Sequence, residues 1–177
     1  NFININEADN HFSSLLDQID WKQDTITVYG KTYLQPRLTA FYATNKNNYK
    51  YSNIVMQPNI FEGVLLDIKN KIETELKIKF TSCLANLYRD GNDSNGWHAD
   101  NEKELGENPI IASVSLGVER VFHMKHKTDK TLKTKLILQH GSLLLMQGET
   151  QTNWLHHIPK TKRNIGKRIN LTFRIIA

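Results

Sequence analysis

The chain has 177 residues, of which 39% are hydrophobic, 9% aromatic and 23% charged, with a net charge of +5. That length suits one domain, which buries about 70% of the surface of its unfolded chain and therefore folds without disulfide bonds or a structural metal. The composition excludes collagen-like and low-complexity proteins, and the single cysteine excludes an internal disulfide and a cysteine-rich zinc site.

Two helices and many short strands are predicted along the chain. Apolar residues at helical spacing indicate a helix over 7–19 and a second one after Pro58. Thr25–Tyr29 and Lys31–Leu34 flank Gly30 and predict a β-hairpin. Further strands are predicted at Phe80–Tyr88, Ile110–Leu116, Arg120–Met124, Leu132–Leu138, Ser142–Met146 and Ile169–Ile176. This pattern favours a sandwich or jelly roll, with the turn-forming segment Asp90–Gly96 as a surface loop.

The basic residues concentrate in the last third of the chain. Residues 1–119 contain 11 Lys/Arg and 16 Asp/Glu, whereas residues 120–177 contain 12 and 2. Such clusters suit a polyanion, with nucleic acid as the leading candidate, although a solvated lysine face explains them equally well. No run approaches the roughly 18 apolar residues of a membrane helix. We expect a monomer inside the cell, cytoplasmic in a bacterium and nuclear in a eukaryote.

His98 and Asp100 are the first candidate metal ligands. Positions i and i+2 of an extended chain point to the same side, so this imidazole and carboxylate can bind one ion together. A third ligand is available from His156 or His157, which point to opposite sides, and spacing does not decide between them. Two histidines and one carboxylate leave open coordination positions, as in non-haem Fe(II) oxygenases. Zinc-dependent hydrolysis is the competing interpretation.

Polar and apolar residues alternate along the last predicted strand. One face carries Arg168, Asn170, Thr172 and Arg174. If that face is buried, its guanidinium groups need anions, and a small dicarboxylate such as 2-oxoglutarate satisfies both. A solvent-facing edge strand is the alternative. Asn86 and Tyr88 share a face of an earlier predicted strand and offer an amide and a phenol to a keto acid.

Together these residues resemble the AlkB family of Fe(II)- and 2-oxoglutarate-dependent dioxygenases. The resemblance spans residues 86–174 and looks closest to the DNA-repair members. It implies a mainly β protein with flanking α-helices, folded as a double-stranded β-helix (jelly roll). It also implies a single dioxygenase domain over residues 1–177, with a nucleotide-recognition lid and hairpin at about 25–55.

The resemblance assigns roles around the metal. It gives His98, Asp100 and His156 to Fe(II), with His157 as a neighbour. Arg168 and Tyr88 would hold the distal carboxylate of 2-oxoglutarate. Arg174 and Asn86 would orient its iron-chelating end, with Asn170 and Thr172 nearby. Trp97 and Trp154 flank the ligand residues and are expected to pack around this site. The implied reaction consumes O2 and 2-oxoglutarate and releases an N-methyl group as formaldehyde.

The same resemblance implies which residues contact the substrate and what the substrate is. The implied contacts are a finger at Val28, Tyr29 and Gly30, together with Arg37, Tyr49, Tyr51, Ser52 and Glu102. The implied substrate is alkylated DNA carrying lesions such as 1-methyladenine and 3-methylcytosine, flipped into the pocket. An RNA or protein demethylase or hydroxylase of the same chemistry, and a non-catalytic nucleic-acid-binding module, are the alternatives.

Overall fold

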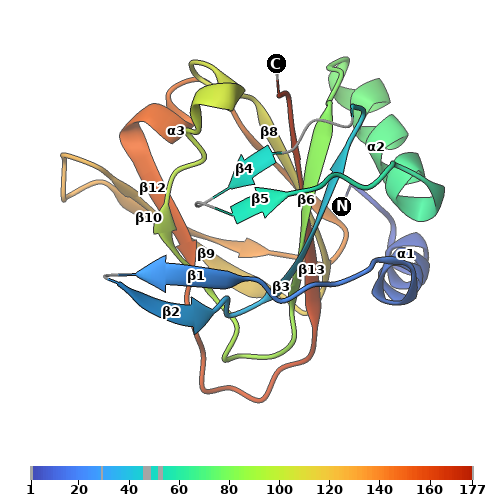
Figure 1. Cartoon of the computed structure of the whole chain (residues 1–177), viewed down its shortest axis with the longest axis horizontal. Helices are drawn as coiled ribbons and strands as arrows, with labels where there is room; N and C mark the ends of the chain where they lie inside the picture. Colours follow the sequence, from blue (N-terminus) through green and yellow to red (C-terminus); the bar gives the residue numbers. More distant parts are fainter. Residues whose placement is uncertain (1, 29, 46–48, 52–53, 177) are drawn as a thin grey trace.

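Two β-sheets and two covering helices make up the fold in a computed structural model, which describes residues 2–28, 30–45, 49–51 and 54–176 (Figure 1). The larger sheet has the order β11 (Ser142–Met146), β8 (Ile111–Gly117), β13 (Arg168–Arg174), β6 (Ser82–Tyr88) and β3 (Leu38–Ala43). The smaller sheet has the order β10 (Lys133–Leu138), β9 (Arg120–His126), β12 (Trp154–Ile158) and β7 (Asn95–His98). The prediction of a mainly β fold with flanking helices is confirmed.

The helices α1 (Ile5–Gln18) and α2 (Gly63–Leu76) cover the outer face of the larger sheet (Figure 1). Asn4 starts α1 because its side chain accepts a hydrogen bond from the Glu7 N–H at 3.0 Å. Both helices were expected from their apolar periodicity, and their apolar faces join one core cluster with the sheet. None of the helices in the described part of the chain is long and apolar enough to cross a membrane.

The central strand β13 separates an apolar layer from a polar one. Ile169, Leu171 and Phe173 are fully buried in the core beneath the helices. The alternate residues therefore face the smaller sheet, and Arg168 and Arg174 are only 1% and 3% exposed. This excludes the solvent-facing edge strand, because β8 and β6 pair with β13 on both sides.

Two hairpins lie outside the main sheets. β1 (Thr25–Val28) and β2 (Lys31–Leu34) pair as expected, and Gly30 adopts a φ of 74° in the two-residue turn, a conformation that favours glycine. The second hairpin, β4 (Tyr49–Tyr51) and β5 (Ile54–Met56), was not predicted. Tyr29 and Ser52 lie outside the described residues, and the structure describes Val28, Tyr49 and Tyr51 only in their backbone.

The surface loop expected over Asp90–Gly96 is confirmed only in part, because Asp90 and Asn92 are exposed in a turn but the rest differs in two respects. β7 already begins at Asn95, and Asp93 is buried because the Arg89 Nε and Nη2 atoms donate to its carboxylate at 2.8 and 2.9 Å. Gly91 packs so closely on Thr161 that a Cβ atom would collide with the Thr161 carbonyl oxygen. The turn-forming residues thus build a packed connection, because tertiary contacts outweigh their local preference for solvent.

A buried carboxylate joins the end of α2 to the start of β6. Glu73 accepts hydrogen bonds from Lys69 Nζ at 2.7 Å, Lys79 Nζ at 2.9 Å and the Phe80 N–H at 2.8 Å. Burial by itself raises the pKa of Glu73, but these hydrogen bonds outweigh it and hold the pKa below the ordinary value of 4.5. The ionised carboxylate therefore stabilises the folded state.

Glu73→Gln should lower the free energy of unfolding at neutral pH by about 2 kcal/mol or more, because Lys69 loses its buried counter-ion. Because the folded-state pKa is lowered, the full stabilisation is present above the ordinary pKa of glutamate and is lost as the pH falls through the folded-state pKa. Denaturant unfolding across this range should show the difference shrinking in acid. The exposed Glu75→Gln on the same helix is the control, and equal effects of the two substitutions would contradict the assignment.

Candidate active site

Three possible metal ligands converge where the two sheets face each other. His98 ends β7, Asp100 follows it, and His156 lies in β12, which pairs with β7 so that His156 is opposite His98. One ligand atom from each residue lies within 4.8 Å of the other two. Across the described ranges, this is the only such group of three His, Cys, Asp or Glu side chains. Pairing of β7 with β12 thus brings together residues that are distant in sequence.

The protonation states of this group suit metal binding. Burial, with help from His98, lowers the pKa of His156 to about 4, so its imidazole is neutral at physiological pH. Burial would raise the pKa of Asp100, but Arg174 and the two imidazoles hold it well below its usual range. A neutral imidazole and an ionised carboxylate are the forms that bind metals. The His156 Nδ1 and Asp100 Oδ1 atoms are buried and lack hydrogen-bond partners in the described structure.

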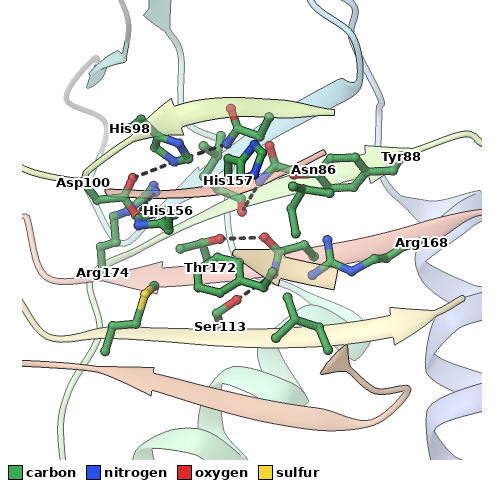
Figure 2. Close-up of a pocket in the computed structure, with 17 residues that line it drawn as sticks. Asn86, Tyr88, His98, Asp100, Ser113, His156, His157, Arg168, Thr172 and Arg174 are labelled. Atoms are coloured by element: carbon green, nitrogen blue, oxygen red, sulfur yellow. Dashed lines mark hydrogen bonds and ion pairs between the residues drawn. The ribbon is translucent and has the colours of Figure 1, made fainter. Parts of the chain in front are cut away.

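His157 lies on the opposite face of β12. Its ring stacks on Trp97 with centroids 3.8 Å apart, and it also contacts the ring of His123. Trp97 is 41% exposed, so the expectation that it packs around the metal ligands is wrong. The reason is strand alternation, since Trp97 lies one residue before the ligand His98 and points away from the ligands. Trp154 packs against His126 and does not line the cavity either. His157 borders the cavity beside His156 but stacks on Trp97 and is not part of the ligand cluster (Figure 2). Between the two neighbouring histidines, the geometry selects His156.

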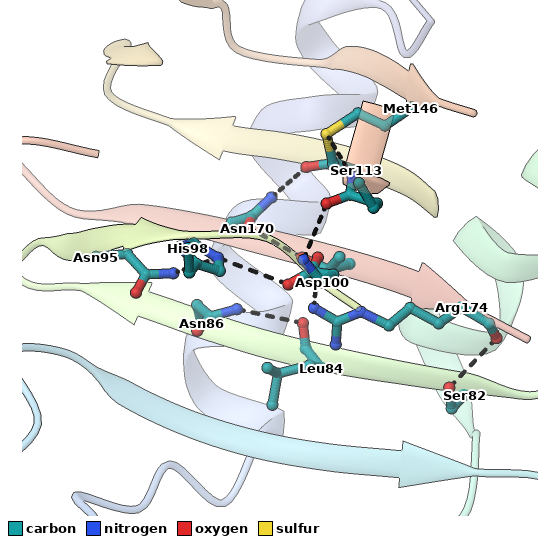
Figure 3. Close-up of polar contacts among 12 residues, drawn as sticks. Ser82, Leu84, Asn86, Asn95, His98, Asp100, Ser113, Met146, Asn170 and Arg174 are labelled. Carbon is teal, nitrogen blue, oxygen red and sulfur yellow. Dashed lines mark hydrogen bonds and ion pairs between the residues drawn. The ribbon is translucent and has the colours of Figure 1, made fainter. Parts of the chain in front are cut away.

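Two further contacts fix Asp100, and Figure 3 shows the one from Arg174. Arg174 Nη2 donates to Asp100 Oδ2 at 2.9 Å, and both side chains are buried. The Asp100 N–H donates to Oε1 of Gln151 at 2.9 Å, from the short helix α3 (Thr150–Asn153). Oδ1 of Asp100 is left for a metal ion. Two nitrogens and one oxygen with an open side fit the facial triad of non-haem iron.

Arg168 forms the opposite, cationic end of the same cavity (Figure 2). It pairs with Tyr88 across β13 and β6, and its Nη2 donates to Ser115 Oγ at 2.9 Å. Its Nε and Nη1 are buried without a hydrogen-bond partner among the described residues. Burial lowers the pKa of Arg168 to about 10, which still leaves it charged at neutral pH. A buried cation with two unused donors requires an anion. A carboxylate is suitable because its two oxygens can accept the paired N–H groups of a guanidinium.

A hydrogen-bonded row of polar side chains lies along the cavity between Arg168 and Arg174. Thr172 Oγ1 donates to Asn170 Oδ1 at 3.1 Å, and Asn170 Nδ2 donates to Ser113 Oγ at 2.8 Å. All three side chains line the cavity together with Asn86 and Tyr88. The expected cosubstrate residues therefore share one cavity with the metal ligands. Its chemistry, a carboxylate-binding cation facing a facial triad, fits 2-oxoglutarate and Fe(II).

Arg174 and Asn86 both line the cavity, each with a contact of its own, whereas two residues expected at the substrate lie outside the lining. Arg174 lies opposite Ser82 and bonds to Asp100, whereas Asn86 lies opposite Asn170 and accepts a hydrogen bond from Arg37 Nε at 2.8 Å. Arg37, expected at the substrate, is 4% exposed and is not among the cavity-lining residues. Glu102 also lies outside that lining, and burial together with Asp100 raises its pKa.

Arg120 is a supporting residue that the sequence did not single out. It is buried, and its Nη2 donates to the carbonyl oxygens of Asp93 at 2.9 Å and Pro159 at 2.6 Å. Its guanidinium also lies 5.6 Å from the centre of the Tyr88 ring. It thereby ties the connections around Tyr88 together. The available signal was its alternation with Phe122, which placed an arginine on the inward face of β9.

Comparisons with known proteins agree with this geometry. Residues 1–174 match the model of the 2OG-Fe(II) oxygenase superfamily. The chain is 45% identical to the alpha-ketoglutarate-dependent dioxygenase alkB homolog 3 of Bos taurus, over 99% of this chain and 64% of that protein. It is 34% identical to the DNA oxidative demethylase ALKBH2 of Mus musculus, over 96% of this chain and 75% of that protein. The chain thus spans slightly less than two thirds of its alkB homolog 3 relative.

Solved structures share the fold. The structure of OsALKBH1 superposes with a TM-score of 0.67 at 18% identity, over 98% of this chain and 94% of that one. An oxidoreductase of the 2OG-Fe(II) oxygenase family from Burkholderia pseudomallei superposes with a TM-score of 0.62 at 10% identity, over 98% and 80%. A jelly roll with two histidines and one carboxylate at its cavity is the arrangement found in non-haem Fe(II) oxygenases. The chain belongs to the 2OG-Fe(II) oxygenase superfamily and, within it, to the AlkB-like dioxygenases, whose cofactors are Fe(II), 2-oxoglutarate and O2.

His156→Ala should abolish stoichiometric binding of Mn(II) or Co(II), whereas His157→Ala should keep it, because only His156 faces His98 and Asp100. Calorimetric titration of chelator-treated protein measures both. The two variants alter adjacent residues of one strand, so each controls for the other. Retained affinity in His156→Ala with loss in His157→Ala would reverse the assignment.

Arg168→Lys should raise the dissociation constant for 2-oxoglutarate by at least about tenfold, because an ammonium group cannot form the paired hydrogen bonds of a guanidinium. Binding is measured on metal-loaded protein by calorimetry under argon. Arg163→Gln removes an exposed arginine from the β12–β13 connection and should leave the dissociation constant for 2-oxoglutarate unchanged. Equal affinities for wild type and Arg168→Lys would argue that the carboxylate binds elsewhere.

Proposed function

We propose that this protein removes N-alkyl groups from bases such as 1-methyladenine and 3-methylcytosine in DNA, a direct reversal of alkylation damage. The observation that carries this proposal is the single cavity that joins the His98, Asp100 and His156 cluster to the unsatisfied guanidinium of Arg168. The relatives named as a dioxygenase and a DNA oxidative demethylase support the reaction and the substrate class.

In this proposal the three clustered side chains hold Fe(II), and Arg168 with Tyr88 holds the distal carboxylate of 2-oxoglutarate. Fe(II), 2-oxoglutarate and O2 together supply the oxidation of the N-methyl carbon, with succinate, CO2 and formaldehyde as the other products. The protein contributes the positions of these groups and the open side of the triad.

The walls of the cavity keep water away from the reacting groups. Tyr88, Phe122, Leu138, Met146 and Ile158 form a buried cluster, and all five line the cavity. Phe122 also stacks beside His156, with ring centroids 5.1 Å apart. Exclusion of water strengthens the interactions of Arg168 and Arg174 with carboxylates.

Surface charge supports a nucleic-acid substrate. Of the 12 basic residues in positions 120–177, only Arg120, Arg168 and Arg174 are buried. The other nine lie at the surface, on the β9–β10 hairpin and the β12–β13 connection. Tyr33 and Leu34, the last two residues of β2, are 51% and 62% exposed and offer an apolar surface to a displaced base.

The test is a panel of oligonucleotides containing 1-methyladenine or 3-methylcytosine, in single-stranded DNA, duplex DNA and RNA. We expect mass spectrometry to show loss of the methyl group from DNA, dependent on Fe(II) and 2-oxoglutarate and matched by succinate formation. His98→Ala, checked for folding by circular dichroism, should be inactive. The exposed Glu75→Gln on α2, away from the cavity and the β1–β2 hairpin, should retain turnover.

Each arm of the panel has a definite meaning. Demethylation confined to RNA would show that RNA is the substrate and would overturn the proposal of DNA. Succinate formation without demethylation of any oligonucleotide would retain the dioxygenase and overturn the nucleic-acid substrate. Salt-sensitive binding of methylated and unmethylated DNA with neither product would instead indicate a non-catalytic binding module.

A further inference from the structure

Arg37 has an unusual position for a residue expected at the substrate. Its side chain is 4% exposed, and its Nε donates to Asn86 Oδ1 at 2.8 Å, a buried contact between residues 49 positions apart. Its Nη1 donates to the Ser94 carbonyl oxygen at 3.3 Å. Asn86 lines the cavity, whereas Arg37 does not. Arg37 therefore stands directly behind a cavity-lining residue.

The contact fixes the orientation of the Asn86 amide. A guanidinium has only donors, so the atom of Asn86 that faces Arg37 must be the carbonyl oxygen. The amide nitrogen is then turned the other way, where it lies 3.4 Å from the Leu84 carbonyl oxygen and keeps a second N–H. Figure 3 shows this amide on the strand beside Arg174 and Asp100. With Oδ1 facing Arg37, the Asn86 group that remains for a carboxylate in the cavity is the second N–H of Nδ2.

Arg37 is itself held in place by its own segment. The Ser94 N–H donates to the Pro36 carbonyl oxygen at 2.9 Å, and the Gln35 N–H donates to the Asp24 carbonyl oxygen at 2.8 Å. Residues 35–37 are thus bonded on both sides, to the connection before β7 and to the residue before β1. A buried arginine on a fixed backbone is suited to orient a neighbour.

We propose that Arg37 is a positioning residue for the cosubstrate, which holds the Asn86 amide so that its Nδ2 donates to a carboxylate oxygen of 2-oxoglutarate. This role differs from direct contact with the damaged base. It rests on the proposed location of 2-oxoglutarate between Arg168 and the metal, and it does not depend on which nucleic acid is the substrate.

A double-mutant cycle tests the proposal on metal-loaded protein without nucleic acid. The variants are Arg37→Gln, Asn86→Ala and the double substitution, and calorimetry under argon gives the dissociation constant for 2-oxoglutarate. Each single substitution should raise it about tenfold, the usual effect of losing one hydrogen bond to a charged group. The double variant should match Asn86→Ala, because Arg37 acts only through Asn86. The affinity for Mn(II) should remain unchanged.

Two further variants separate orientation from general loosening. Arg37→Lys keeps one donor for Asn86 and should give an intermediate dissociation constant, and it takes the place of Arg37→Gln in the cycle if that variant does not fold. Arg89→Gln loosens the same connection through Asp93 without contacting Asn86, and should leave 2-oxoglutarate binding unchanged.

The outcomes separate the positioning role of Arg37 from the assumed location of 2-oxoglutarate and from the nucleic-acid substrate. If Asn86→Ala leaves the affinity unchanged, 2-oxoglutarate does not lie against Asn86, and the inference fails without affecting the nucleic-acid substrate. If Asn86→Ala weakens binding and Arg37→Gln does not, Arg37 has no positioning role. Additive effects in the double variant would mean that Arg37 acts independently of Asn86, which also overturns the proposal.

Discussion

The burial of two arginines on one central strand is the constraint on which the rest of the structure depends. Arg168 and Arg174 lie at the two ends of β13, both almost completely buried. Charged groups removed from water need partners, so one face of β13 must meet polar groups and anions. The other face, with Ile169, Leu171 and Phe173, must meet apolar side chains. The two helices satisfy the second requirement, while the smaller sheet encloses the first.

The two carboxylate oxygens of Asp100 have different roles. One oxygen of Asp100 accepts from Arg174, and the other has no hydrogen-bond partner in the described residues. The arginine keeps the carboxylate ionised without using the oxygen that a metal ion needs. It also attaches the segment after β7 to the larger sheet. Gln151 adds a bond to the Asp100 backbone, so the ligand is fixed at two points.

The sequence predicted what depends on local alternation and missed what depends on distant pairing. The polar face of β13 and the shared side of His98 and Asp100 follow from the two-residue period of a strand. The choice of His156 over His157 requires the pairing of β12 with β7, which spacing does not contain. β7 itself escaped prediction because Asn95 and Gly96 are turn formers, and their strand conformation comes from that pairing.

Arg37 illustrates the same limit at a functional residue. Its neighbours in sequence led to the expectation that it contacts the substrate, but its hydrogen-bond partner Asn86 is 49 residues away. Within four positions the chain passes from the exposed Leu34, at the end of the hairpin, to an arginine buried against the cavity wall. This short segment therefore joins the surface that would meet the nucleic acid to the amide that would meet the cosubstrate. The metal ligand Asp100 relies on separate contacts from α3 and β13, which leaves its position independent of the hairpin.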